Sequence, residues 1–231
     1  MKFSLSVLAV VFCFTACKNK PGASKSEDAG SNAFFYDYQV WGDEEEGIVT
    51  VRLQYRLGGE NGKALRLAQP GFVMLDGDTL KADSAGFTGI FYETSKPLGS
   101  FAGSHGIVFT DNRKKQHKEE FSFEPFTLEN ELPEQIKKAP FLIKLSGFPS
   151  TASRVQLIMV DTSFSSADVN EELWVENGEI KIDSSFLANL SNGPITMEIV
   201  KEDEKTLKNS SREDGRLLLT YRLRRQFEFV D

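Results

Sequence analysis

Side chains that could carry out acid–base or metal chemistry are few in this chain. It contains two histidines, His105 and His117, and neither has a second histidine at the short spacing typical of metal-ligand pairs. A Ser-His-Asp triad would have to use one of them, and the sequence has neither a Gly-x-Ser-x-Gly elbow nor a glycine motif for phosphate binding. We therefore expect surface or turn positions for both histidines, and a protein that is not an enzyme and uses no cofactor.

Carboxylates are the remaining candidates. Residues 43–46, Asp-Glu-Glu-Glu, lie between two expected strands, and clustered oxygens are the ligands that Ca²⁺ prefers. The chain lacks the Asp-x-Asp-x-Asp-Gly calcium pattern, and consecutive acidic residues between strands usually solvate a turn. We adopt the solvated turn, with calcium as the alternative, and treat four further acidic residues in the same way: Asp161, Asp168, Glu171 and Glu172.

The start of the chain has the features of a bacterial signal peptide. Lys2 supplies a positive charge, and residues 3–14 form an apolar run too short to span a bilayer. Residues 14–17, Phe-Thr-Ala-Cys, resemble the lipobox of bacterial lipoproteins. The resemblance implies removal of residues 1–16 and lipidation of Cys17, whereas an ordinary secretory signal with an incidental cysteine is the alternative.

The residues after the lipobox indicate a flexible tether and a membrane location. Residues 17–33 contain no bulky apolar side chain and are rich in Gly, Ser and Ala, which predicts a flexible tether of roughly 22 Å. The residue after Cys17 is Lys18 rather than aspartate, and the resemblance to Gram-negative lipoproteins then implies the outer membrane. The dense acidic run that follows the lipid in many surface-exported lipoproteins of Bacteroidota-like bacteria is absent, so the periplasmic face and the cell surface both stay open.

Charge and cysteine content narrow the partners further. Loss of Lys2 with the signal leaves 26 basic and 34 acidic side chains, a net charge of −8. This balance argues against nucleic acid and against electrostatic binding to anionic lipid, both of which need clustered cations. Cys13 leaves with the signal and Cys17 carries lipid, so thiol catalysis, cysteine metal sites and disulfides are excluded.

Alternating apolar residues predict an all-β fold. The clearest strand is 49–57, in which Val, Val, Leu, Tyr and Leu alternate with polar residues. The run 72–80 contains Asp76-Gly77 and reads as a tight hairpin, because this pair supplies the positive φ angles of a type I′ turn. Further strands are expected at 86–94, 106–110 and 119–126, spaced as in a β-sandwich.

The second half of the chain repeats this pattern. Residues 129–138 are charged and include a proline, which predicts a linker with one helical turn at most. A second hairpin is expected over 174–182, around Asn177-Gly178, and a short helical turn over 183–190. The remaining expected strands are 141–145, 154–160, 195–200 and 217–230.

The two halves therefore predict two domains of similar length. We expect two tandem immunoglobulin-like or fibronectin-like β-sandwiches, at residues 34–128 and 139–231, separated by the linker at 129–138. This architecture resembles that of extracytoplasmic β-sandwich lipoproteins, a resemblance that implies no particular activity. The cysteines and the buried-tryptophan spacing of true immunoglobulin domains are missing.

One arginine conflicts with the strand pattern. In 217–230, Leu219, Tyr221, Leu223, Phe227 and Phe229 share a face, and strict alternation adds Arg225 to it. An unpaired buried charge is costly. Either a β-bulge turns Arg225 outward, or a buried carboxylate pairs with it, for which Asp161 is one candidate.

Three functional hypotheses follow. The first is a lipid-anchored envelope protein that binds or supports another envelope protein without catalysis, since sandwich edges can accept strands from partners. The second is a carbohydrate- or cell-wall-binding module, and the third is a hydrolase that uses paired carboxylates. The second predicts exposed aromatic side chains, for which the candidates are Trp41, Trp174, Tyr92 and Phe101 in the glycine-rich loop 99–106.

Overall fold

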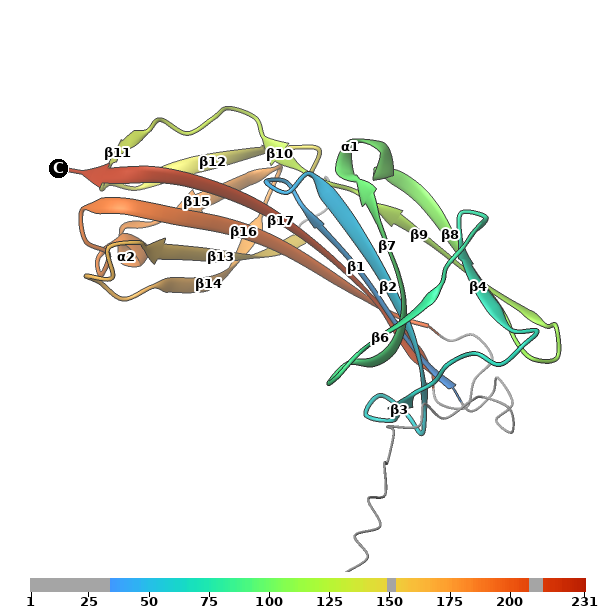
Figure 1. Cartoon of the computed structure of the whole chain (residues 1–231). Coiled ribbons are helices and arrows are strands. Elements are labelled where there is room, and N and C mark those ends of the chain that lie inside the picture. The colour runs from blue at the N-terminus through green and yellow to red at the C-terminus, as the bar shows by residue number, and fades with distance from the viewer. Residues whose placement is uncertain (1–33, 149–152, 208–213) are drawn as a thin grey trace, which may run out of the picture.

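The computed structural model describes residues 34–148, 153–207 and 214–231. The expected signal peptide, Cys17 and tether lie outside the described residues. Strands form nearly all of the regular structure, and the described helices, α1 (Leu98–Phe101) and α2 (Ser184–Leu187), have four residues each (Figure 1). The predicted all-β class, with sheets packed face to face as in a β-sandwich, is confirmed.

A ten-stranded sheet, called the long sheet below, runs through both halves of the molecule. Its main strands have the order β14-β13-β16-β17-β1-β2-β7-β6, while β11 pairs with β17 and β3 pairs with β2. The bounds of its strands are β1 Phe34–Asp43, β2 Ile48–Leu57, β3 Lys63–Ala64, β6 Ala82–Ala85, β7 Gly89–Pro97, β11 Gln135–Lys137, β13 Ser153–Asp161, β14 Val169–Val175, β16 Gly193–Thr206 and β17 Gly215–Val230.

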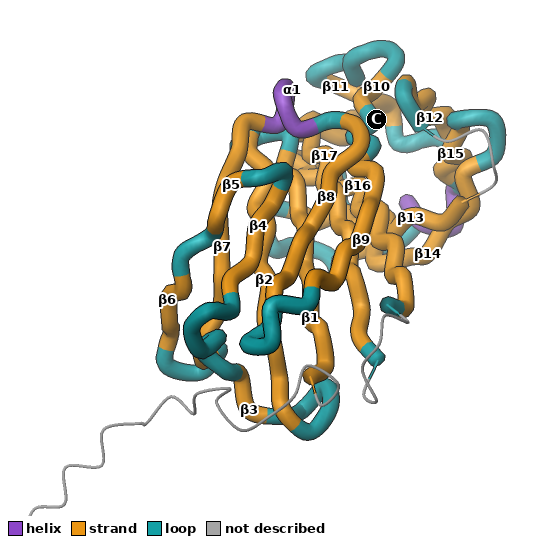
Figure 2. Tube along the Cα trace, turned by 90° about the vertical axis from the view of Figure 1, so that its right-hand side faces the viewer, coloured by secondary structure: helices purple, strands orange, loops and turns teal. Residues whose placement is uncertain are grey.

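Two smaller sheets cover one face of the long sheet at its two ends (Figures 1 and 2). The first has the order β5-β4-β8-β9, and the second has the order β10-β12-β15. Alternating residues of β17 face them and are buried, as the pattern predicts. The bounds are β4 Phe72–Leu75, β5 Asp78–Thr79, β8 Gly103–Thr110, β9 Gln116–Phe123, β10 Thr127–Leu128, β12 Phe141–Ser146 and β15 Glu179–Ile182.

The long strands β16 and β17 link the two ends. All 14 residues of β16 pair with β17 in unbroken register. The first part of β17 also pairs in parallel with β1, from Tyr36 opposite Gly215 to Asp43 opposite Arg222. Strands from the two halves of the chain therefore lie side by side in one sheet. The division into domains at residues 129–138 stays a prediction, and strand pairing crosses it.

The hydrophobic core is continuous from one end to the other. At its middle, the ring of Tyr221 lies 6.0 Å from the ring of Phe123 and 4.9 Å from that of Phe126, edge-on in both cases. Gly42 of β1 leaves room for these rings, because a Cβ atom there would come within 2.5 Å of Phe123. Aromatic contacts of this kind add to the stabilisation from burial.

The two expected turns have the predicted backbone geometry. Asp76 and Gly77 have φ angles of 51° and 90°, and Asn177 and Gly178 have φ angles of 53° and 75°. The second turn is closed by one antiparallel bridge, in which the Glu176 and Glu179 amides each donate to the other residue's carbonyl at 3.2 Å and 2.9 Å. Beyond this bridge β14 pairs with β13 and β15 pairs with β12, so the hairpin expected over 174–182 is confirmed at its turn but does not extend along the strands.

Two connections also have defined structures. The segment expected as a linker with a helical turn contains strand β11, which pairs in parallel with the end of β17. The backbone carbonyls and amides of β17 impose extended structure there, so the expected helical turn is wrong. The helical turn expected over 183–190 is present as α2.

Candidate functional site

The face of the long sheet opposite the smaller sheets carries polar side chains around one tryptophan. Trp41 lies on β1, directly opposite Thr50 of β2 and Thr220 of β17. Side chains alternate along a strand, so Gln39 and Asp43 share this face with Trp41. The parallel pairing of β1 with β17 therefore brings the first and the last strand of the described chain together around the indole.

A groove of about 470 Å³ opens beside Trp41. Its size lies within the range of ligand sites in proteins, roughly 300–1,000 Å³. The lining comes from β1, β16, β17 and the turn after β1, and it combines apolar with charged side chains. Its principal members are Trp41, Glu198, Val200, Leu218, Thr220 and Arg222.

Arg52 of β2 covers one side of the Trp41 indole. Its guanidinium lies 5.0 Å from the Trp41 ring centre and 4.8 Å from that of Phe91, and its Nε donates to Glu93 at 2.6 Å. These contacts hold Arg52 over the rings, where cation–π attraction stabilises it. The groove lies toward β17 and β16, on the side of β1 away from β2 and Arg52.

Ion pairs fix the charged side chains of the groove. The Arg222 Nε atom donates to Asp43 Oδ2 at 2.6 Å, and the Glu46 amide donates to Asp43 Oδ1 at 3.1 Å. Burial opposes ionisation of Asp43, but these hydrogen bonds outweigh burial and lower the pKa of Asp43. Arg222 also lies 3.8 Å from Glu198. The charged groups thus hold one another in place before any ligand arrives.

The acidic turn at residues 43–46 packs against arginines of β17. Besides the Asp43–Arg222 pair, Arg224 Nη1 lies 3.1 Å from a Glu45 oxygen and Arg225 Nη1 lies 2.5 Å from a Glu44 oxygen. The carboxylates that the calcium alternative required are therefore engaged by guanidinium groups. Within the described ranges, no group of three or more His, Cys, Asp or Glu residues is arranged to hold a metal ion.

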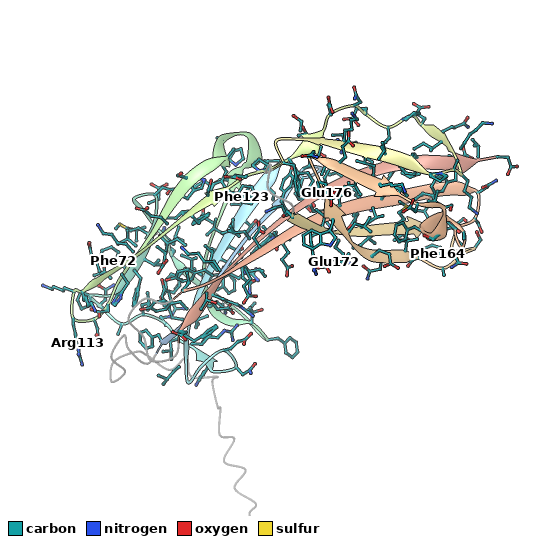
Figure 3. All side chains as sticks on the ribbon, turned by 180° about the vertical axis from the view of Figure 1, so that it is seen from behind. Phe72, Arg113, Phe123, Phe164, Glu172 and Glu176 are labelled. Carbon is teal, nitrogen blue, oxygen red and sulfur yellow. The ribbon has the colours of Figure 1, made fainter. Side chains whose placement is uncertain are left out.

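Trp174 lies on the same face of the long sheet as Trp41. It sits on β14 opposite Arg154 of β13, whose guanidinium lies 4.5 Å from its ring centre, and its side chain is 55% exposed. Figure 3 labels Glu172, which shares this face two residues earlier. Four strand spacings separate the two tryptophans, roughly 19 Å. The structure thus places both on one surface and at different positions along it.

Phe101 and Tyr92 are buried, so the expectation that they are exposed aromatics is wrong. The glycine-rich loop folds into α1 and the start of β8, and the Phe101 ring stacks on His105 at 3.8 Å. The Tyr92 hydroxyl accepts a hydrogen bond from the Leu67 amide at 2.9 Å. In each case packing against the core outweighs the loop or strand-end position that suggested exposure.

Both histidines have structural contacts. The His105 ring lies between Asp76 and the Phe101 carbonyl, with Nδ1 and Nε2 each 2.7 Å from an oxygen. His117 is buried on β9, where its Nε2 atom lies 3.4 Å from Asp111. The expectation of a turn role suits His105, which anchors the turn at Asp76, whereas a surface position for His117 is wrong.

Arg225 is paired with carboxylates and is not turned outward by a bulge. Its guanidinium contacts Glu44 of the turn after β1 and Glu131 of the segment before β11, at 2.5 Å and 2.8 Å. Asp161, the candidate named from the sequence, instead accepts hydrogen bonds from Ser163, Ser165 and Ser166. The unbroken register of β16 with β17 leaves Arg225 on the core-facing side.

The sequence did not predict the groove. Its floor depends on the parallel pairing of β1 with β17, which joins residues about 180 positions apart. A usable signal existed in the complementary charges of residues 43–46 and of Arg222, Arg224 and Arg225, which the structure pairs. Exposed Phe87 and Phe164, both at turns, were also missed, because heavy phenylalanine use indicated core filling.

No helix in the described part of the chain has the length and apolar character needed to cross a membrane.

Comparisons with known proteins give only distant likenesses. No protein-family model and no curated protein matches the sequence. Trypsin-activated alpha-2-macroglobulin from Escherichia coli matches 90% of this chain at 14% identity with a TM-score of 0.27, and this chain spans only 16% of that chain. The IG1+IG2 structure of DIP-gamma matches 81% of this chain and 95% of its own at 9% identity, with a TM-score of 0.24.

A third solved structure is the SGBP-B protein of the Bacteroides ovatus mixed-linkage glucan utilization locus, in complex with a mixed-linkage heptasaccharide. It matches 76% of this chain and 53% of its own, at 12% identity and a TM-score of 0.20. At these TM-scores the likenesses show no family, ligand or partner for this chain.

Proposed function

We propose that the protein is a non-catalytic binding protein of the bacterial cell envelope, held to a membrane by lipid on Cys17, and that it binds carbohydrate in the groove beside Trp41. The observation that carries this proposal is the position of the indole, with Arg52 on one side and the groove on the other. From the sequence alone, another envelope protein is the first expectation for the partner. The groove favours a glycan instead.

The chemistry of the groove suits a sugar. Sugars present apolar C–H faces and polar hydroxyl edges, and an indole bordered by fixed donors and acceptors matches both. Val200 and Leu218 extend the apolar surface, while Glu198 and Arg222 supply charged hydrogen-bonding groups on the same face. Because Arg222 is paired with carboxylates, its charge is already offset, which favours a neutral ligand over an ionic one.

The state of the groove carboxylates supports binding without catalysis. A glycosidase needs one carboxyl group whose pKa is raised so that it can act as a general acid near neutral pH. The pKa of Asp43 is lowered instead, and Glu198 lies beside two arginines, Arg222 and Arg224. Asp43 is therefore suited to accept hydrogen bonds from hydroxyl groups and not to donate a proton as a general acid.

The two tryptophans allow a direct test, since the chain contains no others. A Trp174→Phe variant leaves Trp41 as the single indole, and we expect a saturable change in its emission when linear β-glucan oligosaccharides, chitooligosaccharides or peptidoglycan fragments are added. By calorimetry, Trp41→Ala should weaken binding at least tenfold, or about 1.4 kcal/mol. Trp174→Ala, the matched control, should change it less than twofold.

Two outcomes would contradict the carbohydrate proposal. One is the absence of binding to every one of these glycans by the wild-type protein. The other is an equal loss of affinity in the Trp41→Ala and Trp174→Ala variants, which would place the sugar outside the groove. Thermal unfolding of each variant checks that lost binding does not reflect lost structure.

A second candidate function, binding of another envelope protein, is favoured by the turn between β13 and β14. Phe164 stands at this turn with its side chain 87% exposed and φ at 56° (Figure 3). Buried Asp161 accepts hydrogen bonds from the amides of Ser163 and Ser165 at 2.8 Å and 3.1 Å. The turn thus holds a large apolar side chain in water, as expected of an interface anchor.

Co-purification in mild detergent tests this second candidate. A stoichiometric partner recovered with the wild-type protein should be lost with Phe164→Asn, because asparagine tolerates the positive φ angle and removes the ring. Leu142→Ser, which removes another exposed apolar side chain from the smaller sheet, is the matched control and should retain the partner. Retention by both variants would exclude the turn. Cys17→Ala tests the anchor separately, and we expect that variant to leave the membrane fraction.

A further inference from the structure

One end of the molecule, called the entry end below, is where the described chain begins. Phe34 is the first residue of β1 and pairs with Leu57 of β2, which in turn pairs with Lys63 of β3. The Phe34 ring also lies 6.3 Å from the ring of Phe109, close to the turn between β8 and β9. These contacts bring β3 and that turn to the same end, and Figure 1 shows both beside the start of β1.

The turn between β8 and β9 presents three consecutive cations at the entry end. Buried Asp111 accepts hydrogen bonds from the amides of Arg113 and Lys115, both at 2.9 Å, and Lys114 has a φ angle of 64°. The Asp111 carboxylate is thus engaged by backbone amides inside the turn. The side chains of Arg113, Lys114 and Lys115 are exposed, and Figure 3 shows Arg113 at the tip.

A cleft of about 680 Å³ lies at the same end, between β3 and the hairpin of β6 and β7. Its lining includes Arg56, Lys63 and Arg66 and contains no acidic residue, although Arg56 is paired with buried Asp37 at 3.1 Å. Phe87, at the tip of the hairpin and at the edge of the cleft, has a relative exposure of 111%. Leu57 adds a second exposed apolar side chain.

We propose that the entry end is a docking surface for the anionic headgroups of a lipid bilayer. Cations attract such a surface, and an exposed aromatic ring partitions into the headgroup region. Position supports the same partner, because 16 residues separate Cys17 from Phe34 and can span roughly 60 Å at most. This proposal rests on the lipid anchor in the proposed function and is independent of the groove.

The net charge of the chain did not predict this surface. A balance of −8 for the mature chain argued against electrostatic binding to lipid, but the cations of the entry end come from separate segments, 63–66 and 113–115, that only the fold brings together. Glu60, near β3, pairs with Arg216 at 2.6 Å. Local charge, and not the total, decides attraction to a membrane at distances of about 10 Å.

The test uses the lipidated full chain in nanodiscs of phosphatidylcholine, with and without added phosphatidylglycerol, followed by amide hydrogen exchange. In the anionic discs we expect exchange at residues 84–89 and 111–116 to slow at least threefold, and the effect to vanish at high salt. The double variant Lys114→Glu/Lys115→Glu should abolish it. Lys144→Glu/Lys181→Glu, at exposed positions on β12 and β15, is the matched control and should not.

The outcomes separate this inference from the anchor on which it rests. If the protein binds both kinds of disc but exchange at the entry end is the same in each, the proposed docking surface is contradicted and the proposed lipid anchor is not. An equal effect of the two double variants also overturns it, because the attraction would then reflect total charge. Failure of the wild-type chain to associate with either disc overturns the anchor, and docking in this form with it.

Discussion

The ring of Tyr221 stands edge-on to the ring of Phe126, 4.9 Å away, at the point where the two smaller sheets meet above β17. Tyr221 belongs to the strand that both ends of the molecule share, and Phe126 to the connection between the smaller sheets. The contact therefore joins the parts of the core that lie at either end. Stability at one end should depend on packing at the other.

Replacement of Tyr221 by alanine should destabilise both ends together. Loss of a buried aromatic side chain costs about 3–5 kcal/mol. Urea unfolding followed in Trp174→Phe and Trp41→Phe backgrounds reports on two regions of the long sheet, because the remaining indole lies on β1 in the first background and on β14 in the second. We expect both transitions to shift to lower urea by the same amount. Two separated transitions would show that the ends unfold independently.

A fragment of residues 34–128 should not fold on its own. It lacks β17, so the backbone groups of β1 that pair with Gly215 to Arg222 would be left without partners. Circular dichroism and proton NMR of the fragment check this expectation. A dispersed, cooperatively unfolding fragment would instead support the division of the chain into two domains at residues 129–138.

Arg225 should stabilise the fold mainly through Glu44. Glu44 is 22% exposed and Glu131 is 72% exposed, and water screens the second pair more strongly. We expect Arg225→Ala to lower the free energy of unfolding by about 1–3 kcal/mol, between the value for exposed ion pairs and that for fully buried ones. Double-mutant cycles with Glu44→Gln and Glu131→Gln measure each coupling, and that with Glu44 should be larger. Normal stability of Arg225→Ala, with loss of binding alone, would contradict a structural role.

Acid should weaken the fold partly through Asp43. Its pKa is lowered in the folded state, so its ionised form contributes stability above the unfolded pKa of about 3.9, and this contribution is lost as pH falls through the folded pKa. We expect Asp43→Asn to unfold more easily at neutral pH and to lose less stability on acidification than the wild type. Chemical denaturation from neutral pH to pH 2 checks this difference.

Glu119 should have the opposite effect. The pKa of Glu119 is raised, because the effect of burial exceeds the opposing effect of nearby Lys205. The contribution of Glu119 to stability is therefore greatest below the unfolded pKa of about 4.3, and it is lost as pH rises through the folded pKa. Glu119→Gln should therefore be more stable than the wild type at neutral pH and show no gain in acid. The same titration in the two proteins measures the sign. A loss of stability at neutral pH would mean that the ionised carboxylate supports the fold.

Local patterns predicted the strands and turns well. Alternation located β2, β12 and β13 to within a few residues, and the Asp76-Gly77 and Asn177-Gly178 pairs adopt the expected positive φ angles. These features depend on residues close in sequence. The pairing of β14 with β13, and not with β15, depends on which layer each strand joins, and no local pattern carries that information.

The candidate site was predicted only in part. Trp41 and Trp174 were identified as candidates, and both lie on the open face, where Trp174 is exposed and Trp41 is half-buried, while Phe101 and Tyr92 are buried. An aromatic residue in a glycine-rich loop or at a strand end looks the same in sequence whether it points to water or to the core. The groove beside Trp41 required the pairing of strands from opposite ends of the chain, which composition and spacing do not reveal.

The parallel pairing of β1 with β17 also has a mechanical consequence. A pull on the chain at Phe34 acts along β1, while the backbone hydrogen bonds to β17 and β2 run across it. Such a load shears two ladders at once, and does not open them one bond at a time. If the protein is anchored through the chain before Phe34 and pulled through a ligand on the open face, the force acts on β1. This strand is hydrogen-bonded to a neighbour on both sides, to β17 and to β2.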